Sequence, residues 1–171
     1  MAMTNLPSNP VPTLSPRLAS TDDVAELVRV EKQVHASPWD EAHFLAEMEK
    51  PYSRVLVMTD DETDSVIAGY VVFWLMFDEA QILNIAVDLP FRGLGLARAL
   101  IRQVVSHAIK KDIRKVILDV RKSNQPAIQL YQSMKFAVAQ VRKGFYSDGE
   151  DAYTMVLNLD DSAMSSEEKA F

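Results

Sequence analysis

The chain has 171 residues, which is enough for one domain with a hydrophobic core and too short for two of ordinary size. Its net charge of −6 does not favour a polyanionic partner, so direct nucleic-acid binding is not expected. The absence of cysteine excludes a disulfide framework, a thiolate nucleophile and a thiolate-ligated metal site.

No segment resembles a membrane span or a secretion signal. The longest apolar run, 66–77, is shorter than the roughly 18 residues that a spanning helix needs, and Gly69 interrupts it. The first residues also lack the basic-then-apolar order of a signal peptide. We therefore expect a cytoplasmic protein that does not associate with membranes.

Both ends of the chain have the composition of flexible tails. Residues 1–16 contain four prolines among small polar residues, and residues 160–171 are acidic and serine-rich. Neither segment contains enough apolar side chains to order itself. This predicts one folded domain over residues 17–159.

The first half of that domain is expected to form two helices and three strands. Acidic residues at 21–23 precede an amphipathic run, so a helix begins there with carboxylates near its positive end. The segment 37–40 ends this helix, and a second helix follows and ends before Pro51. The expected strands lie at 54–58, 65–77 and 80–87, with a turn at 60–62 between the first two.

The second half alternates helices with strands. We expect a helix from Gly95 to about Lys111 and a shorter one from Asn124, its cap, to Met134. Strands are expected at 115–121, 136–141 and 153–159. Interleaved helices and strands predict an α/β domain with a central mixed sheet flanked by helices.

The most informative segment is 84–98, where a buried strand runs through a glycine-containing turn into a helix. Such a turn exposes backbone N–H groups that have no partner within the helix, and the helix dipole adds positive potential. Gly93 and Gly95 would let a phosphate approach the backbone. A loop that needs two glycines only for its own geometry is the alternative. The segment is neither a P-loop nor a dinucleotide-binding fingerprint, because it lacks Gly-Lys-Ser/Thr and the third glycine of G-x-G-x-x-G.

The spacing Arg92-x-x-Gly95-x-Ala97 resembles the Q/R-x-x-G-x-G/A pattern of the GNAT acetyltransferases. Further motifs extend the resemblance over residues 17–159, in particular to the RimI type that acetylates protein N-termini. These motifs are E-x-x-x-H-x-x-P-W at 31–39, L-N-I-A-V at 83–87, L-D-V-R-K-S-N at 118–124, A-x-x-L-Y at 127–131 and E-D-A-x-x-M at 150–155. Two positions depart from the family pattern: Asp119 replaces a catalytic glutamate, and Lys135 replaces the glycine before Phe136.

The resemblance implies acetyl-CoA as the co-substrate, bound through its pyrophosphate by the glycine turn, and no metal. The residues implied at this site are Ile85, Ala86, Val87, Arg92, Gly93, Leu94, Gly95, Leu96, Ala97, Arg98 and Asn124. Asn124 can also serve simply as a helix cap, and the two roles are compatible.

Acetyl transfer to an amine needs a base for the amine and an acid for the departing thiolate. The candidate base is Asp119, an acid inside an apolar strand, with Glu79 in reserve. A structural role for Asp119, paired with Arg121 or capping the next helix, is the alternative. The resemblance implies that Tyr131 is the general acid to the sulfur of CoA, although a tyrosine on a helix stripe is more often a core residue.

The acceptor side is expected to be lined by aromatic residues. The resemblance implies that Trp39 lies beside the acceptor-peptide channel, and Phe145 and Tyr146 form a second candidate wall. The three histidines do not share a spacing typical of metal ligands.

The leading hypothesis is acetyl transfer to the N-terminal α-amine of a protein, with the N-terminal alanine of a small-subunit ribosomal protein as the acceptor that the resemblance implies. One alternative is a GNAT enzyme that acts on a small amine, such as a polyamine or an amino acid. The other is a non-catalytic acyl-CoA-binding module, which the presence of both Asp119 and Tyr131 disfavours.

Overall fold

The structure is a computed structural model that describes residues 13–60 and 66–159. Most of the two predicted tails, residues 1–12 and 160–171, and most of the predicted turn at 60–62 lie outside the described residues. None of the α-helices in the described part of the chain is both long and apolar enough to cross a membrane.

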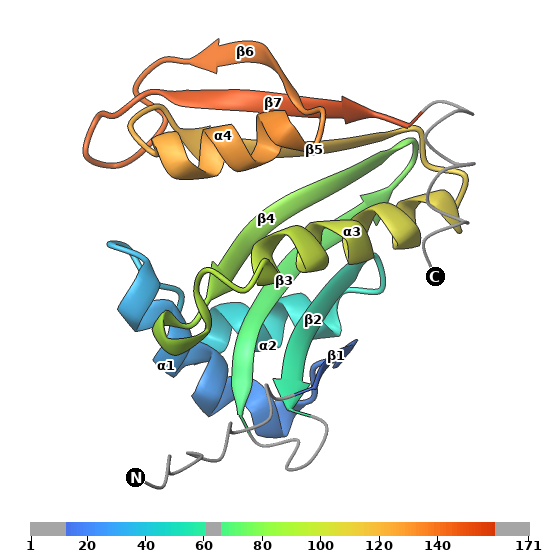
Figure 1. Cartoon of the computed structure of the whole chain (residues 1–171), viewed down its shortest axis with the longest axis vertical. Coiled ribbons are helices and arrows are strands. Elements are labelled where there is room, and N and C mark those ends of the chain that lie inside the picture. The colour runs from blue at the N-terminus through green and yellow to red at the C-terminus, as the bar shows by residue number, and fades with distance from the viewer. Residues whose placement is uncertain (1–12, 61–65, 160–171) are drawn as a thin grey trace, which may run out of the picture.

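Seven strands form one mixed sheet in the order β1-β2-β3-β4-β5-β7-β6 (Figure 1). Every neighbouring pair is antiparallel except β4 and β5, which are parallel. The predicted α/β class with a mixed sheet is confirmed. The strands are β1 (Leu14–Leu18), β2 (Ser53–Asp60), β3 (Ile67–Met76), β4 (Glu79–Val87), β5 (Lys115–Arg121), β6 (Ala137–Arg142) and β7 (Ala152–Asn158).

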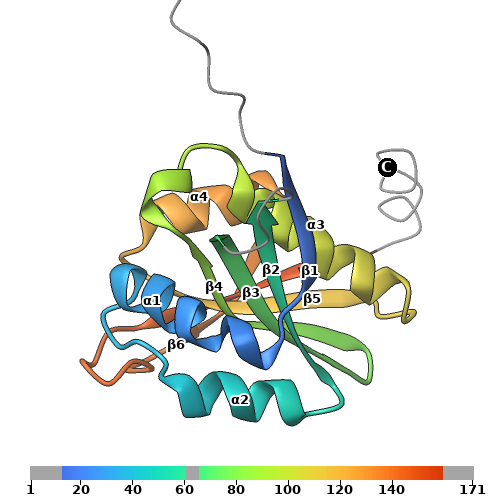
Figure 2. The ribbon, with the colours of Figure 1, turned by 90° about the horizontal axis from the view of Figure 1, so that it is seen from below.

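Helices cover both faces of the sheet, two on each face (Figure 2). On one face α1 (Val24–Val34) and α2 (Glu41–Glu49) pack against β2, β3 and β4. On the other, α3 (Leu96–Ile109) and α4 (Gln125–Ser133) enclose the larger core. Short 3-10 helices at Thr21–Asp23 and Leu89–Phe91 precede α1 and α3.

The parallel pair β4–β5 separates partway along its length. The two strands are paired from Glu79 and Lys115 to Ile82 and Leu118. Beyond this point β4 stays with β3 and β5 stays with β7, so the sheet opens. A register shift between Val72 and Phe73, opposite Asn84 and Ile82, leaves Leu83 as the extra residue of β4 where the separation begins.

Strand β1 was not predicted, and the expected tail boundary at residue 16 falls inside it. Pro16 lies opposite Met58 on an edge strand, where a missing backbone N–H need not disrupt the sheet. Both terminal guanidinium nitrogens of Arg17, Nη1 and Nη2, donate to Asp23, at 2.8 and 2.9 Å, and this hydrogen bonding lowers the pKa of the Asp23 carboxyl. The folded part therefore begins before residue 17.

The end of α4 shows how the chain accommodates Lys135, whose φ of 73° is left-handed. The amide of Phe136 donates to the carbonyl of Tyr131, and that of Lys135 donates to Gln132, both at 3.0 Å. The rings of Tyr131 and Phe136 are in contact, with centroids 5.8 Å apart. These are the bonds and the apolar contact of a Schellman motif, in which glycine is the favoured left-handed residue.

We predict that Lys135→Gly stabilises the protein by roughly 0.5–1 kcal/mol. Left-handed backbone costs a side-chain-bearing residue about 1–2 kcal/mol, and the greater freedom of glycine in the unfolded chain offsets part of the gain. Urea denaturation measures the difference. The matched control is Lys110→Gly at the end of α3, where φ is −61° and glycine should only destabilise. Equal effects at the two lysines would contradict the explanation.

Candidate active site

A cavity of about 910 Å³ occupies the opening between β4 and β5. Its walls come from the diverging strand ends, the turn before α3, the first residues of α3 and α4, and the segment after α1. The lining residues are Glu31, Val34, His35, Ser37, Trp39, Ile82–Val87, Phe91, Arg92, Gly93, Gly95–Arg98, Leu118–Arg121, Asn124, Pro126, Ala127, Leu130, Tyr131 and Tyr146.

One end of the cavity is the glycine turn. Gly93 and Gly95 have left-handed φ values of 79° and 78°, and a Cβ placed on either would meet no protein atom within 4 Å. Gly95 caps α3 without a side chain, so the first amides of the helix are not covered by a capping group. This end of the cavity therefore combines free N–H donors, the positive end of a helix dipole and space for an anion.

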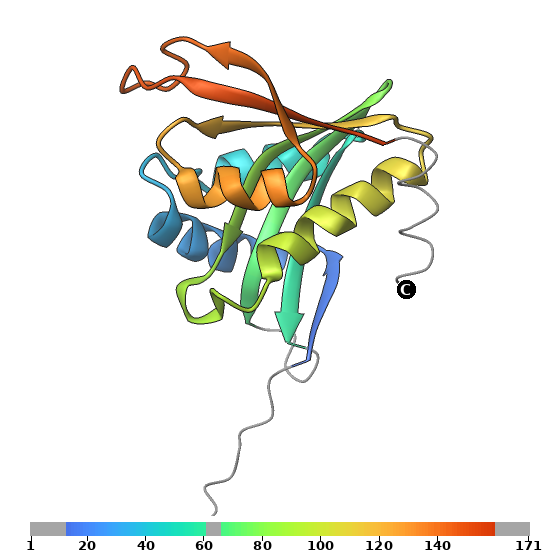
Figure 3. The same ribbon diagram turned by 45° about the horizontal axis from the view of Figure 1, so that its top comes forward.

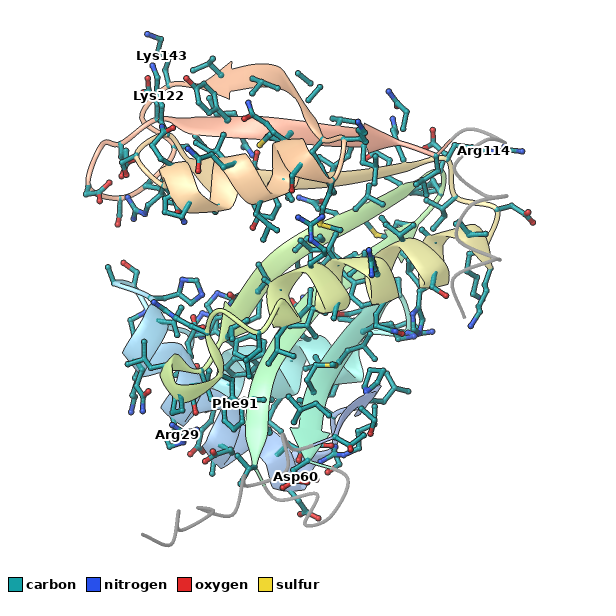
Figure 4. All side chains as sticks on the ribbon, in the orientation of Figure 1. Arg29, Asp60, Phe91, Arg114, Lys122 and Lys143 are labelled. Atoms are coloured by element: carbon teal, nitrogen blue, oxygen red, sulfur yellow. The ribbon has the colours of Figure 1, made fainter. Side chains whose placement is uncertain are left out.

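The turn is held in place by a buried carboxylate. Asp88 caps the short helix by accepting from the amide of Leu89 at 2.8 Å, and its other oxygen accepts from Arg29 of α1 at 2.6 Å. Figure 4 shows Arg29 beside the turn that carries Phe91. The contact between Asp88 and Arg29 thus fixes the position of the loop relative to α1, so its conformation does not depend on its glycines alone.

The predicted cofactor residues are brought together at this end. All of them line the cavity except Leu94, whose side chain is exposed. Asn124 caps α4 as expected, accepting from the amide of Ala127 at 3.3 Å. Arg98 donates to Ser133 at 2.7 Å and so links α3 to α4, whose neighbouring ends are visible in Figure 3.

Asp119 lines the cavity, and both of its carboxylate oxygens accept hydrogen bonds. One accepts from Thr154 of β7 at 2.5 Å, and the other accepts from Arg142 of β6 at 2.7 Å. Arg121, the partner considered for a purely structural role, pairs instead with Asp148 and Glu150, each at 2.8 Å. The Asp119 carboxylate therefore has a fixed position on the strand end that faces the cavity.

Tyr131 of α4 lines the same cavity and is 7% exposed. Burial, together with the nearby Tyr146, raises the pKa of its hydroxyl to about 12. The ring packs in the core, but no hydrogen bond ties its hydroxyl to the backbone or to a side chain among the residues that the structure describes, unlike the alternative of a purely core tyrosine. At neutral pH it is a protonated phenol that can donate.

Aromatic residues form the other end. Trp39 and Tyr146 line the cavity, whereas Phe145 does not and packs against Tyr146 with ring centroids 5.1 Å apart. Two guanidinium groups stack on this pair: Arg121 lies 3.9 Å from the Tyr146 ring and Arg142 lies 3.9 Å from the Phe145 ring. Arg142 thus connects this aromatic pair to Asp119.

Glu79 is not brought to the cavity. It lies at the opposite end of β4, where its carboxylate pairs with Lys115 at 2.7 Å. Because β4 runs from Glu79 to Val87, only its later part, Ile82–Val87, reaches the site.

Sequence reasoning did not assign a role to Glu31, His35 or Asn84, which also line the cavity. A signal was present for Glu31, since it falls on the buried stripe of α1 with Leu27 and Val28. Asn84 likewise stands as a polar residue within the apolar stretch 82–87. Both are buried.

The chain matches the model of the acetyltransferase (GNAT) family over residues 21–136. It is 37% identical over 142 residues to a Bacillus subtilis (strain 168) protein named, as a provisional assignment, ribosomal protein bS18-alanine N-acetyltransferase, covering 82% of this chain and 92% of that one. It is 33% identical over 142 residues to the Escherichia coli (strain K12) protein of that name, covering 81% and 93%.

Solved structures agree with these relatives. The crystal structure of the ribosomal-protein-S18-alanine N-acetyltransferase from Escherichia coli aligns with a TM-score of 0.78 at 30% identity, covering 86% of this chain and 95% of that one. Ard1 from Thermoplasma volcanium aligns with a TM-score of 0.79 at 28% identity, covering 86% and 99%.

We predict that Gly95→Val lowers the affinity for acetyl-CoA by at least about tenfold. The new side chain enters the space where the phosphate would meet the backbone, and a β-branched residue is strained at a φ of 78°. Calorimetry with acetyl-CoA measures the change. Gly149→Val is the matched control, because Gly149 is also left-handed with open space around it but does not line the cavity. Equal affinities for the wild type and Gly95→Val would remove the turn from the binding site.

Proposed function

Because the chain belongs to the acetyltransferase (GNAT) family, we propose that it transfers the acetyl group of acetyl-CoA to the N-terminal α-amine of a protein. The observation that carries the proposal is the single cavity with two different ends. One end offers backbone donors to a phosphate, and the other is an aromatic-lined mouth suited to a chain terminus. Asp119 and Tyr131 line the same cavity.

In this proposal the acceptor nitrogen attacks the thioester carbon directly, since the chain has no cysteine to carry the acetyl group. The ammonium must first lose a proton. Asp119 accepts it through a water molecule, because an aspartate is one methylene shorter than a glutamate and its carboxylate is held back by Arg142 and Thr154.

As the C–S bond breaks, negative charge develops on the carbonyl oxygen of the thioester and on the departing sulfur, and both atoms need donors. The β4 backbone beyond Ile82 is not paired with β5, so its free amides can bond the carbonyl oxygen of the thioester as negative charge develops there. Tyr131 gives its proton to the departing sulfur, and its raised pKa of about 12 keeps the phenol protonated at neutral pH until that step.

For the acceptor itself we propose the N-terminal alanine of a small-subunit ribosomal protein. The support is that the Bacillus subtilis and Escherichia coli relatives carry bS18-alanine in their names and align over more than nine-tenths of their own length. A ribosomal acceptor would place the reaction in the cytoplasm.

The acceptor prediction is that short peptides beginning with alanine are acetylated on their α-amine. Turnover of acetyl-CoA is followed by mass spectrometry, with peptides that differ only in their first residue, a peptide blocked at its N-terminus but containing lysine, and spermidine. We expect product from the free alanine peptide and little from the blocked peptide or the polyamine. Acetylation of only the lysine side chain or the polyamine would overturn the proposal.

The mechanistic prediction is that Tyr131→Phe lowers kcat by about 100-fold and leaves acetyl-CoA affinity nearly unchanged. The substitution keeps the ring and its contact with Phe136 and removes only the proton donor, whose contribution is made in the transition state. Because the pKa of Tyr131 is near 12, the wild type should not lose activity through this group below about pH 10.

Asp119→Asn provides the contrast in the same pH–rate profile. A missing base matters most at low pH, where the acceptor is an ammonium, so part of the activity should return at high pH. Asp119→Glu should retain substantial activity. A wild-type kcat for Tyr131→Phe with chemistry rate-limiting would show that Tyr131 is a packing residue, and Asp119→Asn activity equal to wild type at every pH would make Asp119 structural.

A further inference from the structure

Glu31 of α1 is a buried carboxylate at the acceptor end of the cavity, with 1% of its surface exposed. One carboxylate oxygen accepts from the backbone amide of Trp39 at 2.9 Å and from Nδ2 of Asn84 at 3.1 Å. The other accepts from the hydroxyl of Tyr70. A single side chain therefore joins α1, β3, β4 and the segment that follows α1.

These three donors are all neutral groups. Burial and the charge of Glu31 raise the pKa of Tyr70, which keeps that hydroxyl protonated and donating. Among the described residues no Lys or Arg forms an ion pair with this carboxylate, and His35, 3.6 Å away, is a charged partner only when it is protonated. Low-dielectric surroundings screen a carboxylate charge less than water does. The negative potential extends into the part of the cavity where the acceptor amine would arrive as a cation.

His35 lies beside this carboxylate and lines the cavity with it. Its Nε2 lies 3.6 Å from Glu31 Oε2, is buried, and has no hydrogen-bond partner among the described residues, while the ring lines the cavity. A small rotation of the ring would bring Nε2 within hydrogen-bond distance of the carboxylate. Nε2 of His35 can therefore bond either to Glu31 or to a group that enters the cavity.

We propose that Glu31 is a positioning residue for the acceptor. Its carboxylate fixes the backbone of Trp39, orients His35 and supplies the negative potential that draws the ammonium of the acceptor into the cavity. Glu31 acts through these groups and touches neither acetyl-CoA nor the reacting atoms. This inference rests on the proposed transfer to an N-terminal amine, and it assigns ground-state acceptor binding to a residue separate from Asp119 and Tyr131.

The test compares Glu31→Gln with Glu47→Gln. Glu47 is the matched control, because it is a buried glutamate on α2 that accepts from Ser53, Trp74 and Lys50 and does not line the cavity. We expect Glu31→Gln to raise KM for an alanine-first peptide by about tenfold while the acetyl-CoA Kd, measured by calorimetry, changes less than about twofold. Glu47→Gln should leave both constants near their wild-type values.

His35 gives a second test that does not disturb a buried charge, since its side chain is about one-third exposed. His35→Gln can place an amide N–H near the position of Nε2 and should retain most of the peptide affinity, whereas His35→Phe keeps a ring and should raise KM as Glu31→Gln does. If the two residues act as one unit, the double variant Glu31→Gln/His35→Phe should be little worse than either single variant.

The outcomes separate the inference from the proposed function. No turnover of any free peptide by the wild type overturns both. Peptide turnover by the wild type together with an unchanged KM in Glu31→Gln and His35→Phe overturns the inference alone. A loss of acetyl-CoA binding in Glu31→Gln equal to its loss of peptide affinity also overturns it, because that result would give Glu31 a general structural role.

Discussion

The separation of β4 from β5 is the constraint on which the site depends. The strands pair as a parallel ladder as far as Ile82 and Leu118, and then each follows its antiparallel neighbour. Backbone groups and side chains that would otherwise be sealed inside a continuous sheet are left facing a cavity. The two helix starts that complete the cavity are the next α-helices after these strands: α3 begins after the glycine turn that follows β4, and α4 begins shortly after β5.

Helix α1 stabilises both ends of this opening through charge. Arg29 reaches the buried Asp88 at the glycine turn, and Glu31, two residues later, reaches Asn84, Tyr70 and the Trp39 amide. Removing one partner of a buried charge is costly, so these contacts fix the turn and the acceptor wall relative to the same helix. The two ends of the cavity are therefore positioned together.

Where the family pattern has a catalytic glutamate, this chain has Asp119, and neighbouring residues hold its carboxylate in place. The shorter side chain is held by Thr154 on β7 and Arg142 on β6, and Arg142 also stacks on Phe145. A substitution that displaces Phe145 would therefore also displace Arg142 and alter its hydrogen bond to the Asp119 carboxylate. In the proposed mechanism this makes Asp119 a base of fixed position that works through water, rather than a mobile one that reaches the amine.

Much of the fold and the cofactor end was determined by sequence alone. The order of helices and strands, the turn with Gly93 and Gly95, and the cap at Asn124 are local features, because periodicity and capping depend on residues a few positions apart. Lys135 was singled out in a different way, because the family pattern has a glycine at this position, and the structure shows that its backbone is left-handed. Strand β1 was not, because Pro16 suits a strand only at the edge of a sheet, and the edge is not a local property.

Only the tertiary structure decided how the distant residues meet. It separated Glu79 from the cavity and gave Asp119 its partner Arg142 in place of Arg121. It also brought Glu31 to Asn84, 53 positions away in the chain. Each outcome depends on strand order and on the point where β4 and β5 part, and neither is encoded in the spacing of neighbouring residues. A charge on the buried stripe of a helix shows that a partner must exist, and the packed structure identifies that partner.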